Sequence, residues 1–376
     1  MRSILCLLIL LPSLAIGQSE PSKFEIKGYV KEMVSLGRFK SDLFSADSLD
    51  NLIHNRLNFA WYPNENWTAK LEIRTRLING DTYQNVPGYE KLIDNNNDYF
   101  DLSWIPVSSN KTLLHTMVDR VFVQYNKNDW EVTLGRQRLN WGVNLAWNPN
   151  DLFNSYNFVD FDYEERQGSD AFRVRKYTGY ASEVEFAIKA ADSFEELTGA
   201  FKYQINKWNY DIQFIGGVMK NNLAIGTGWA GNIKGLGFKG EFTYLNEFAS
   251  TNSGAIGSIS LDYLFPNSFY LNGSAMYSSY GAANPSSGFV GSNVNLDIRN
   301  LSPYNWSTFL QLAYPIHPLL NAGFSTMLFP SDGSTLLIPS LTYSIVENLD
   351  LDLISQMYFG DLYDYNSVFL RIKFSY

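Results

Sequence analysis

This 376-residue sequence has few of the features that mark disulfide-rich proteins or helical membrane proteins. Its only cysteine is Cys6, so the chain beyond it can form no disulfide framework. After residue 17, no apolar run reaches the roughly twenty residues that a transmembrane helix requires. The sequence therefore excludes a disulfide-stapled scaffold and a bundle of membrane helices.

Motifs for catalysis, metal binding and nucleotide binding are also missing. His54 and His115 have no neighbouring serine with an orienting acid, and no His/Cys/Asp group has the spacing of metal ligands. The chain has no phosphate-binding loop and no dinucleotide fingerprint. Its net charge of -9 and pI of about 5.0 disfavour nucleic acid as a partner. We expect no enzyme activity, cofactor or metal, although a triad assembled only by the fold stays open at this stage.

The N-terminus has the three regions of a secretory signal peptide. A short positive segment, Met1–Ser3, precedes the apolar run Ile4–Leu11, which is too short to span a bilayer. Ala15-Ile16-Gly17 then fits a cleavage site with small residues. We predict that residues 1–17 are removed, that residues 18–376 form one domain, and that the protein is exported.

What the sequence does have is alternation, most clearly in its last nine residues. Every second residue is apolar, and Arg371, Lys373 and Ser375 lie between them; the apolar set is Val368, Leu370, Ile372, Phe374 and Tyr376. A β-strand sends these two sets to opposite faces, one suited to lipid and one to water. A soluble sandwich edge would alternate in the same way. Aromatic residues make up 16% of the chain, and a membrane chain without helices must close into a barrel.

Alternating segments and tight polar turns predict a transmembrane antiparallel up-and-down β-barrel of about eighteen strands. An even number places both termini on the tight-turn side, which is the periplasmic side in this class. The weakest segment is 171–178, so sixteen strands remain an alternative. The predicted strands are 24–34, 52–62, 66–77, 115–126, 130–139, 171–178, 182–190, 197–206, 208–218, 223–231, 235–245, 254–264, 268–278, 303–314, 319–329, 335–345, 349–358 and 367–376.

One motif resembles known porin-like families. Leu134–Gly142 reads Leu-Gly-Arg-Gln-Arg-Leu-Asn-Trp-Gly and is followed by Asn148-Pro-Asn-Asp. This pattern resembles alginate-export-type barrels and the porin-like family called domain of unknown function 1302. The latter has a Pro-Gly-Ser element where this chain has Gln167-Gly-Ser. The aromatic C-terminus also resembles bacterial outer-membrane barrels, whose last strand is read by the assembly machinery. The resemblance implies a barrel of about eighteen strands with a loop folded inward.

Three long loops are predicted on the side opposite the tight turns, at 78–114, 140–170 and 279–302. Their acidic residues are ordinary for solvated outer loops. The second loop, with Trp141, Asn144, Trp147 and Asp151, is predicted to fold into the lumen and narrow it. Alternatively, its tryptophans belong to the aromatic girdle at the membrane interface.

If the apolar residues of each strand face lipid, the alternate residues face the lumen. In the first half of the barrel these lumen-facing residues include most of the arginines. A lipid-facing Arg or Lys costs roughly 2–4 kcal/mol near the midplane, which favours this phase. Strict alternation instead puts Arg136 and Arg138 outside, so either a bulge at Gly135 turns them inward or they lie at the headgroups. The remaining lumen candidates are Arg56, Arg74, Arg76, Arg120, Arg173, Arg175 and Arg371.

Clustered guanidinium groups in a narrow pore attract anions. The sequence therefore predicts an outer-membrane channel, of porin or polymer-export type, that passes or binds small anionic or carbohydrate solutes. Its expected partners are outer-membrane lipid, the barrel-assembly machinery and the solute. Two alternatives stay open: the arginines only brace the wall by pairing with acids such as Glu72, or the barrel is a non-conducting scaffold or adhesin that organises surface polysaccharide.

Overall fold

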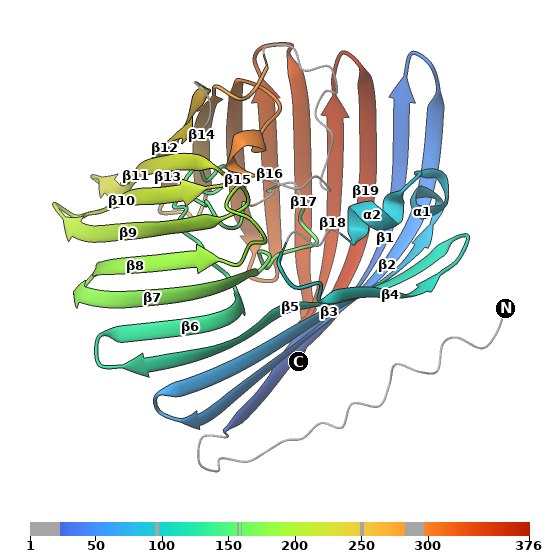
Figure 1. The fold of residues 1–376 in the computed structure, drawn as a ribbon. Coiled ribbons are helices and arrows are strands. Elements are labelled where there is room, and N and C mark those ends of the chain that lie inside the picture. The colour runs from blue at the N-terminus through green and yellow to red at the C-terminus, as the bar shows by residue number, and fades with distance from the viewer. Residues whose placement is uncertain (1–22, 95–97, 156–157, 159, 249–251, 283–296) are drawn as a thin grey trace.

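The structure is a computed structural model that describes residues 23–94, 98–155, 158, 160–248, 252–282 and 297–376. The predicted signal peptide, residues 1–17, lies outside the described residues. Nearly all regular structure belongs to one antiparallel sheet (Figure 1). Its strands are β1 (Phe24–Ser41), β2 (Ser45–Asn64), β3 (Trp67–Gly80), β4 (Ser103–Ser108), β5 (Thr112–Lys127), β6 (Trp130–Gln137), β7 (Ser169–Gly179), β8 (Ser182–Lys189), β9 (Thr198–Lys207), β10 (Tyr210–Met219), β11 (Asn222–Ile233), β12 (Leu236–Glu247), β13 (Ser253–Leu264), β14 (Tyr270–Ser278), β15 (Trp306–His317), β16 (Leu320–Phe329), β17 (Ser334–Val346), β18 (Leu349–Phe359) and β19 (Tyr363–Ser375).

The sheet closes on itself because β1 pairs with β2 on one edge and with β19 on the other. The short β4 pairs only with β5, at residues 113–117, which lie beyond the part of β5 that pairs with β6. It therefore does not belong to the ring of strands. The remaining strands form a closed 18-strand antiparallel barrel, as predicted. The weakest predicted strand, 171–178, is β7.

The long connections lie at one end of the barrel and the tight turns at the other, as the alternation predicts. Residues 81–111 include two five-residue helices, α1 (Asp81–Asn85) and α2 (Tyr89–Ile93), as well as β4. Ile93 and Tyr89 pack on the inward residues Ile78 and Leu113, so this segment covers the lumen side of β3 and β5. Among the described residues, no helix is long and apolar enough to cross a membrane.

The two faces of the wall differ as the phasing predicts. On β9 to β13, exposed apolar residues such as Phe201, Phe214 and Ile225 alternate with buried ones such as Ala200 and Ile215. Aromatic side chains gather near the tight turns, where Trp67 and Tyr125 pair across strands with ring centroids 4.7 Å apart. The outer surface is therefore an apolar band with an aromatic girdle, as lipid contact requires.

Two local features depart from the predicted strands. β1 and β2 extend well beyond 34 and 52, forming the tall blue hairpin of Figure 1. At the tip of this hairpin the exposed ion pair Arg38–Asp47 takes the place of alternating apolar residues. The apolar pattern therefore does not predict a strand there. In β5, the pairing shifts between Glu72 and Ile73 of β3, and the extra residue is Asp119. This β-bulge places a fully buried carboxylate in the lumen wall.

The C-terminal residue takes part in barrel closure. The backbone N–H groups of Gly28 and Tyr376 each donate to the other residue's carbonyl at 2.9 Å. A Cβ at Gly28 would lie 2.2 Å from the Arg56 carbonyl oxygen and 2.8 Å from the Tyr376 hydroxyl, so only glycine fits. The seam between β1 and β19 thus depends on a close approach at its end.

We expect deletion of Tyr376 to weaken this seam, because both backbone hydrogen bonds are lost, each worth about 0.5–1.5 kcal/mol net. The measurement is the fraction of heat-modifiable folded protein in membranes, together with the urea midpoint. Tyr376→Phe is the control, since it keeps the backbone bonds and should behave nearly as the parent. Equal folding of the deletion and the parent would show that the seam does not need this residue.

Candidate functional site

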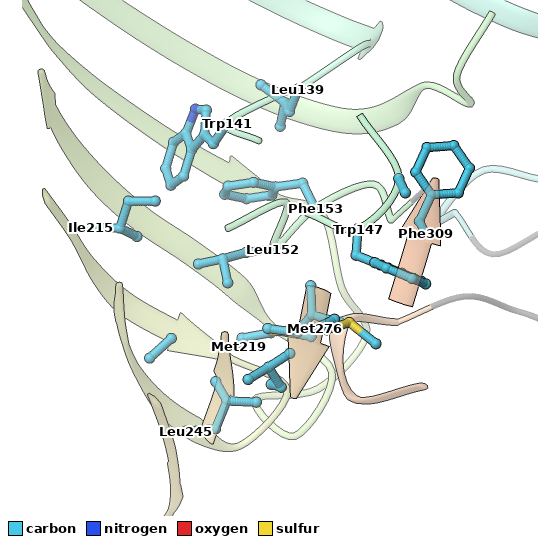
Figure 2. Close-up of a cluster of buried hydrophobic side chains, with 14 of the residues drawn as sticks. Leu139, Trp141, Trp147, Leu152, Phe153, Ile215, Met219, Leu245, Met276 and Phe309 are labelled. Atoms are coloured by element: carbon cyan, nitrogen blue, oxygen red, sulfur yellow. The ribbon is translucent and has the colours of Figure 1, made fainter. Parts of the chain in front are cut away.

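The chain between β6 and β7 enters the barrel, and its described residues, 138–155, 158 and 160–168, are called the inward loop. Figure 2 shows Trp141, Trp147 and Phe153 of this loop beside wall residues such as Ile215 and Phe309. Trp141 is 2% exposed and Trp147 4% exposed. Both tryptophans therefore lie inside the barrel and not in the outer girdle.

The first half of the inward loop is anchored to β12 by a buried carboxylate. Glu241 accepts the backbone N–H groups of Val143, Asn144 and Asn150 at 2.6, 2.9 and 2.9 Å. The Asn144 amide also donates to the Ser258 hydroxyl on β13 at 2.6 Å. These loop N–H groups have no partner in a neighbouring strand, and the Glu241 carboxylate accepts their hydrogen bonds instead. This side chain therefore holds the first half of the loop in place.

Asp151 organises the loop from within. Its Oδ1 accepts the backbone N–H groups of Trp141 and Gly142 at 2.6 and 2.8 Å, and its Oδ2 pairs with Arg166 at 2.8 Å. Gly142 is required here, because a Cβ would lie 2.3 Å from Asn148 Oδ1. The motif residues Gly142, Asn148 and Asp151 therefore form the turn of the inward loop.

The second half of the inward loop reaches the opposite wall. Asp162 Oδ1 lies 3.1 Å from Lys31 Nζ of β1, and its Oδ2 lies 2.9 Å from His54 Nδ1 of β2. Arg120 of β5 donates to the Arg166 carbonyl at 2.9 Å. Together with the Glu241 anchor, these contacts carry the loop across the lumen between two distant parts of the wall.

Two glutamates extend this anchor. Glu164 pairs with Lys373 at 2.7 Å and with Arg371 at 3.5 Å, both on β19. Glu165 accepts the Tyr29 hydroxyl at 2.9 Å and lies 3.6 Å from Arg56 Nε. The loop acids predicted to be solvated are thus partly engaged inside the barrel, because the wall offers them cations.

Burial opposes the charge of Asp162, but the hydrogen bond to His54 and the charge of Lys31 hold the pKa of this carboxyl well below its ordinary value. Burial likewise opposes the charge of Glu164, and the charges of Lys31 and Lys373 outweigh it and lower its pKa. A depressed pKa means that both contacts are present above the ordinary carboxyl range and are lost only as the pH falls through the lower folded value. The Asp162 and Glu164 carboxyls are therefore ionised at neutral pH.

Most arginines predicted for the lumen are paired with acids. Arg56 is fully buried and lies 2.5 Å from both Glu72 and the bulge residue Asp119. Arg120 lies 3.4 Å from Glu72. Further pairs join Arg173 to Glu131, Arg175 to Glu185 at 2.6 Å and Arg371 to Asp352 at 2.9 Å. The positive charge of these groups is therefore largely matched within the wall.

Arg136 lies apart from these residues. The pairing of β6 with both neighbours runs through Gly135 without a register shift, although Gly135 has a φ of 119°. No bulge turns Arg136 inward, so it keeps the outward phase of Leu134 at the long-loop end. There it donates to the Phe100 carbonyl and pairs with Asp170 at 2.8 Å. Arg138 is the first residue of the inward loop.

Arg74 and Arg76 differ from the other arginines. They are alternate residues of β3, and among the described residues neither has a carboxylate within 4.0 Å. Arg74 is 4% exposed and lies 3.9 Å from the centre of the Tyr163 ring. Arg76 donates to the Ile93 carbonyl at 3.0 Å, and its contact with His115 Nδ1 is 3.1 Å. The Nε groups of both arginines have no hydrogen-bond partner.

The lumen wall is chemically divided. Every arginine within a barrel strand lies on β1 to β7 or on β19, and β8 to β18 contain none. The inward residues of that second region include hydroxyl and amide side chains, such as Gln213, Thr243, Ser260, Asn272, Ser307 and Ser325. One side of the lumen thus carries the guanidinium groups, and the other carries hydroxyl and amide groups together with charged residues such as Lys202, Glu241 and Asp352.

Sequence reasoning missed two residues of this site. Asp119 faces the lumen only because of the bulge, which alternation cannot reveal. Glu241 alternates with Thr243 in the inward phase, and that signal was available in the sequence. Among the described residues, no group of three His, Cys, Asp or Glu side chains is placed to hold a metal ion.

The comparisons with known proteins concern the fold. No protein-family model matches the sequence, and no curated protein matches it. The resemblance to the alginate-export-type and domain of unknown function 1302 families is therefore not confirmed. Among solved structures, OccK5 (OpdH) of Pseudomonas aeruginosa matches with a TM-score of 0.57 and 9% identity, over 94% of this chain and 98% of that chain. OccAB4 of Acinetobacter baumannii matches with a TM-score of 0.56 and 11% identity, over 94% and 98%.

We expect Glu241→Ala to release the first anchor of the inward loop. Three backbone N–H groups lose their acceptor, and each buried unsatisfied group costs about 1–3 kcal/mol. The measurements are the urea midpoint and the rate of proteolytic cleavage within residues 141–152, which should fall and rise respectively. Glu247→Ala on the same strand is the control and should change neither. An unaltered cleavage rate in Glu241→Ala would contradict the anchoring role.

Proposed function

We propose that this protein is a bacterial outer-membrane channel whose arginine-bearing lumen admits small anionic or carbohydrate solutes. The similar solved structures are Occ/Opd outer-membrane porins, and the apolar outer band with its aromatic girdle suits a bilayer. The predicted signal peptide is consistent with export. Outer-membrane lipid and the barrel-assembly machinery would then be its partners.

The observation that carries this proposal is the pair Arg74 and Arg76. The positive charge of these two guanidinium groups is offset only at longer range, by carboxylates such as Asp160 and Asp162, and a narrow, weakly solvated lumen strengthens its attraction for anions. An arginine also binds a carboxylate in a bidentate manner. The paired arginines, by contrast, chiefly brace the wall.

Carbohydrate solutes are supported by the opposite side of the lumen. Half-buried inward side chains of that side, such as Ser274 on β14 and Gln311 on β15, can hydrogen-bond to sugar hydroxyls, while the arginines hold an acidic group. The motif Gly135–Gly142 and Asn148–Asp151 adds support for a polymer-export variant, since its residues shape the inward loop.

The second candidate is a non-conducting scaffold or adhesin that anchors surface polysaccharide. It is favoured by the inward loop, which is bound to two distant parts of the wall and occupies part of the lumen. The two candidates differ in one measurable property, which is conductance in a bilayer.

We expect the purified protein to conduct and to prefer chloride over potassium in planar bilayers with a salt gradient. Replacing both Arg74 and Arg76 by Gln should shift the reversal potential toward cations. The shift should shrink at high salt, because the Debye length falls from about 10 Å at 0.1 M to about 3 Å at 1 M. The control removes two ion-paired cations of the outer loops, Arg38→Gln with Lys111→Gln, and should change selectivity little. Cation preference in the unmodified protein would contradict the anion proposal, and absence of conductance would favour the scaffold.

We propose that both termini are periplasmic and that the long loops face outward. An epitope inserted at Asp361, between β18 and β19, should be labelled by antibody on intact cells. An epitope at Asn348, in the tight turn between β17 and β18, should be labelled only after the outer membrane is opened. Labelling of the Asn348 epitope on intact cells would reverse this orientation.

A further inference from the structure

Residues 160–165 read Asp-Phe-Asp-Tyr-Glu-Glu and are called the acidic segment. The segment lies on a group of cations drawn from three strands, β1, β2 and β19. Its carboxylates pair with Lys31, Arg371 and Lys373 and approach Arg56, while Asp162 also contacts His54. The wall therefore holds the acidic segment in the way that a receptor holds a bound acidic peptide.

Aromatic contacts complete this arrangement. Phe161 packs edge-on against Phe369 of β19, with ring centroids 4.8 Å apart. The Tyr163 ring lies under the Arg74 guanidinium at 3.9 Å, and its hydroxyl donates to Asp119. The wall thus contacts both the acidic and the aromatic side chains of the segment.

The acidic segment is held less permanently than the first half of the inward loop. The Glu164 side chain is 40% exposed, so water and ions reach its pairs with Arg371 and Lys373. The Glu241 anchor, in contrast, is buried and uses backbone N–H groups. Salt and competing anions weaken exposed ion pairs far more than buried hydrogen bonds. Asp162 and its partner Lys31 are buried, so a ligand can begin to displace the segment only from its Glu164 end.

We infer that the basic wall formed by Lys31, Arg371 and Lys373 is a binding site for an acidic peptide with aromatic residues. The acidic segment is its internal occupant, and an incoming peptide must displace it. This inference rests on the proposed function, since it identifies a solute class for the same lumen. The inference adds that the acidic segment competes with the incoming peptide for the same site.

The test uses the full-length protein in detergent and a fluorescein-labelled peptide with the sequence of residues 160–165. The variant Asp162→Asn, Glu164→Gln, Glu165→Gln removes the charge of the internal occupant. Fluorescence anisotropy should then show at least about tenfold tighter peptide binding than in the unmodified protein. A peptide with Asn and Gln in place of its acids should bind neither protein.

The matched control removes three acidic charges from exposed loops outside the barrel lumen: Glu195→Gln, Glu196→Gln, Asp361→Asn. It should bind the peptide as weakly as the unmodified protein. Because Asp162 neutralises the buried Lys31, the triple variant is first checked for its heat-modifiable folded form. Glu164→Gln alone, at a more exposed position, should give a smaller gain of about threefold and does not depend on that outcome.

Equal peptide binding in Glu164→Gln, the triple variant and the control would overturn the inference, whatever the conductance of the protein. Tighter binding of a short polyuronate than of the peptide would overturn the peptide assignment. A gain in peptide affinity without conductance would instead support the internal occupant and reject the channel. The peptide-binding test and the conductance test can therefore fail independently of each other.

Discussion

Closure of the sheet by β1 and β19 is the constraint on which the other features depend. Once the ring is closed, each strand has one face outside and one inside, and every charged residue of a strand is assigned to one of them by alternation. The outer face keeps its apolar band, and the cations are collected on one side of the lumen. The inward loop then crosses an interior whose charges are already in place.

The pairing of charges within the lumen determines which charged groups are left to interact with a solute. Wall carboxylates such as Glu72, Asp119, Glu131 and Asp352 compensate most of the guanidinium groups, so the arginines of β2, β5, β7 and β19 are paired within the wall. Arg74 and Arg76 have no carboxylate within 4.0 Å; Tyr163 of the acidic segment lies against Arg74, and the charges of Asp160 and Asp162 reach both arginines only at longer range. The bracing alternative and the anion-binding proposal thus apply to different arginines of the same wall.

The sequence was sufficient for the barrel, for its eighteen strands and for the phase of Arg56, because period-two alternation and turn residues are local signals. It could not indicate the bulge at Asp119, since one extra residue leaves the apolar pattern nearly intact. It also could not show which arginines are paired, because partners such as Asp162 and Lys31 are separated by 131 residues in sequence. Sequence similarity adds little here, and the comparisons establish only the fold.

The central claim is that positive charge without a close carboxylate partner in the lumen is concentrated at Arg74 and Arg76. Anomalous diffraction from crystals soaked in bromide tests it most directly, because the ion reports where an anion is held. The account predicts bromide beside the Arg74 and Arg76 guanidinium groups and none beside Arg56, whose carboxylate partners exclude it. Bromide beside Arg56, with none at Arg74 and Arg76, would contradict the account.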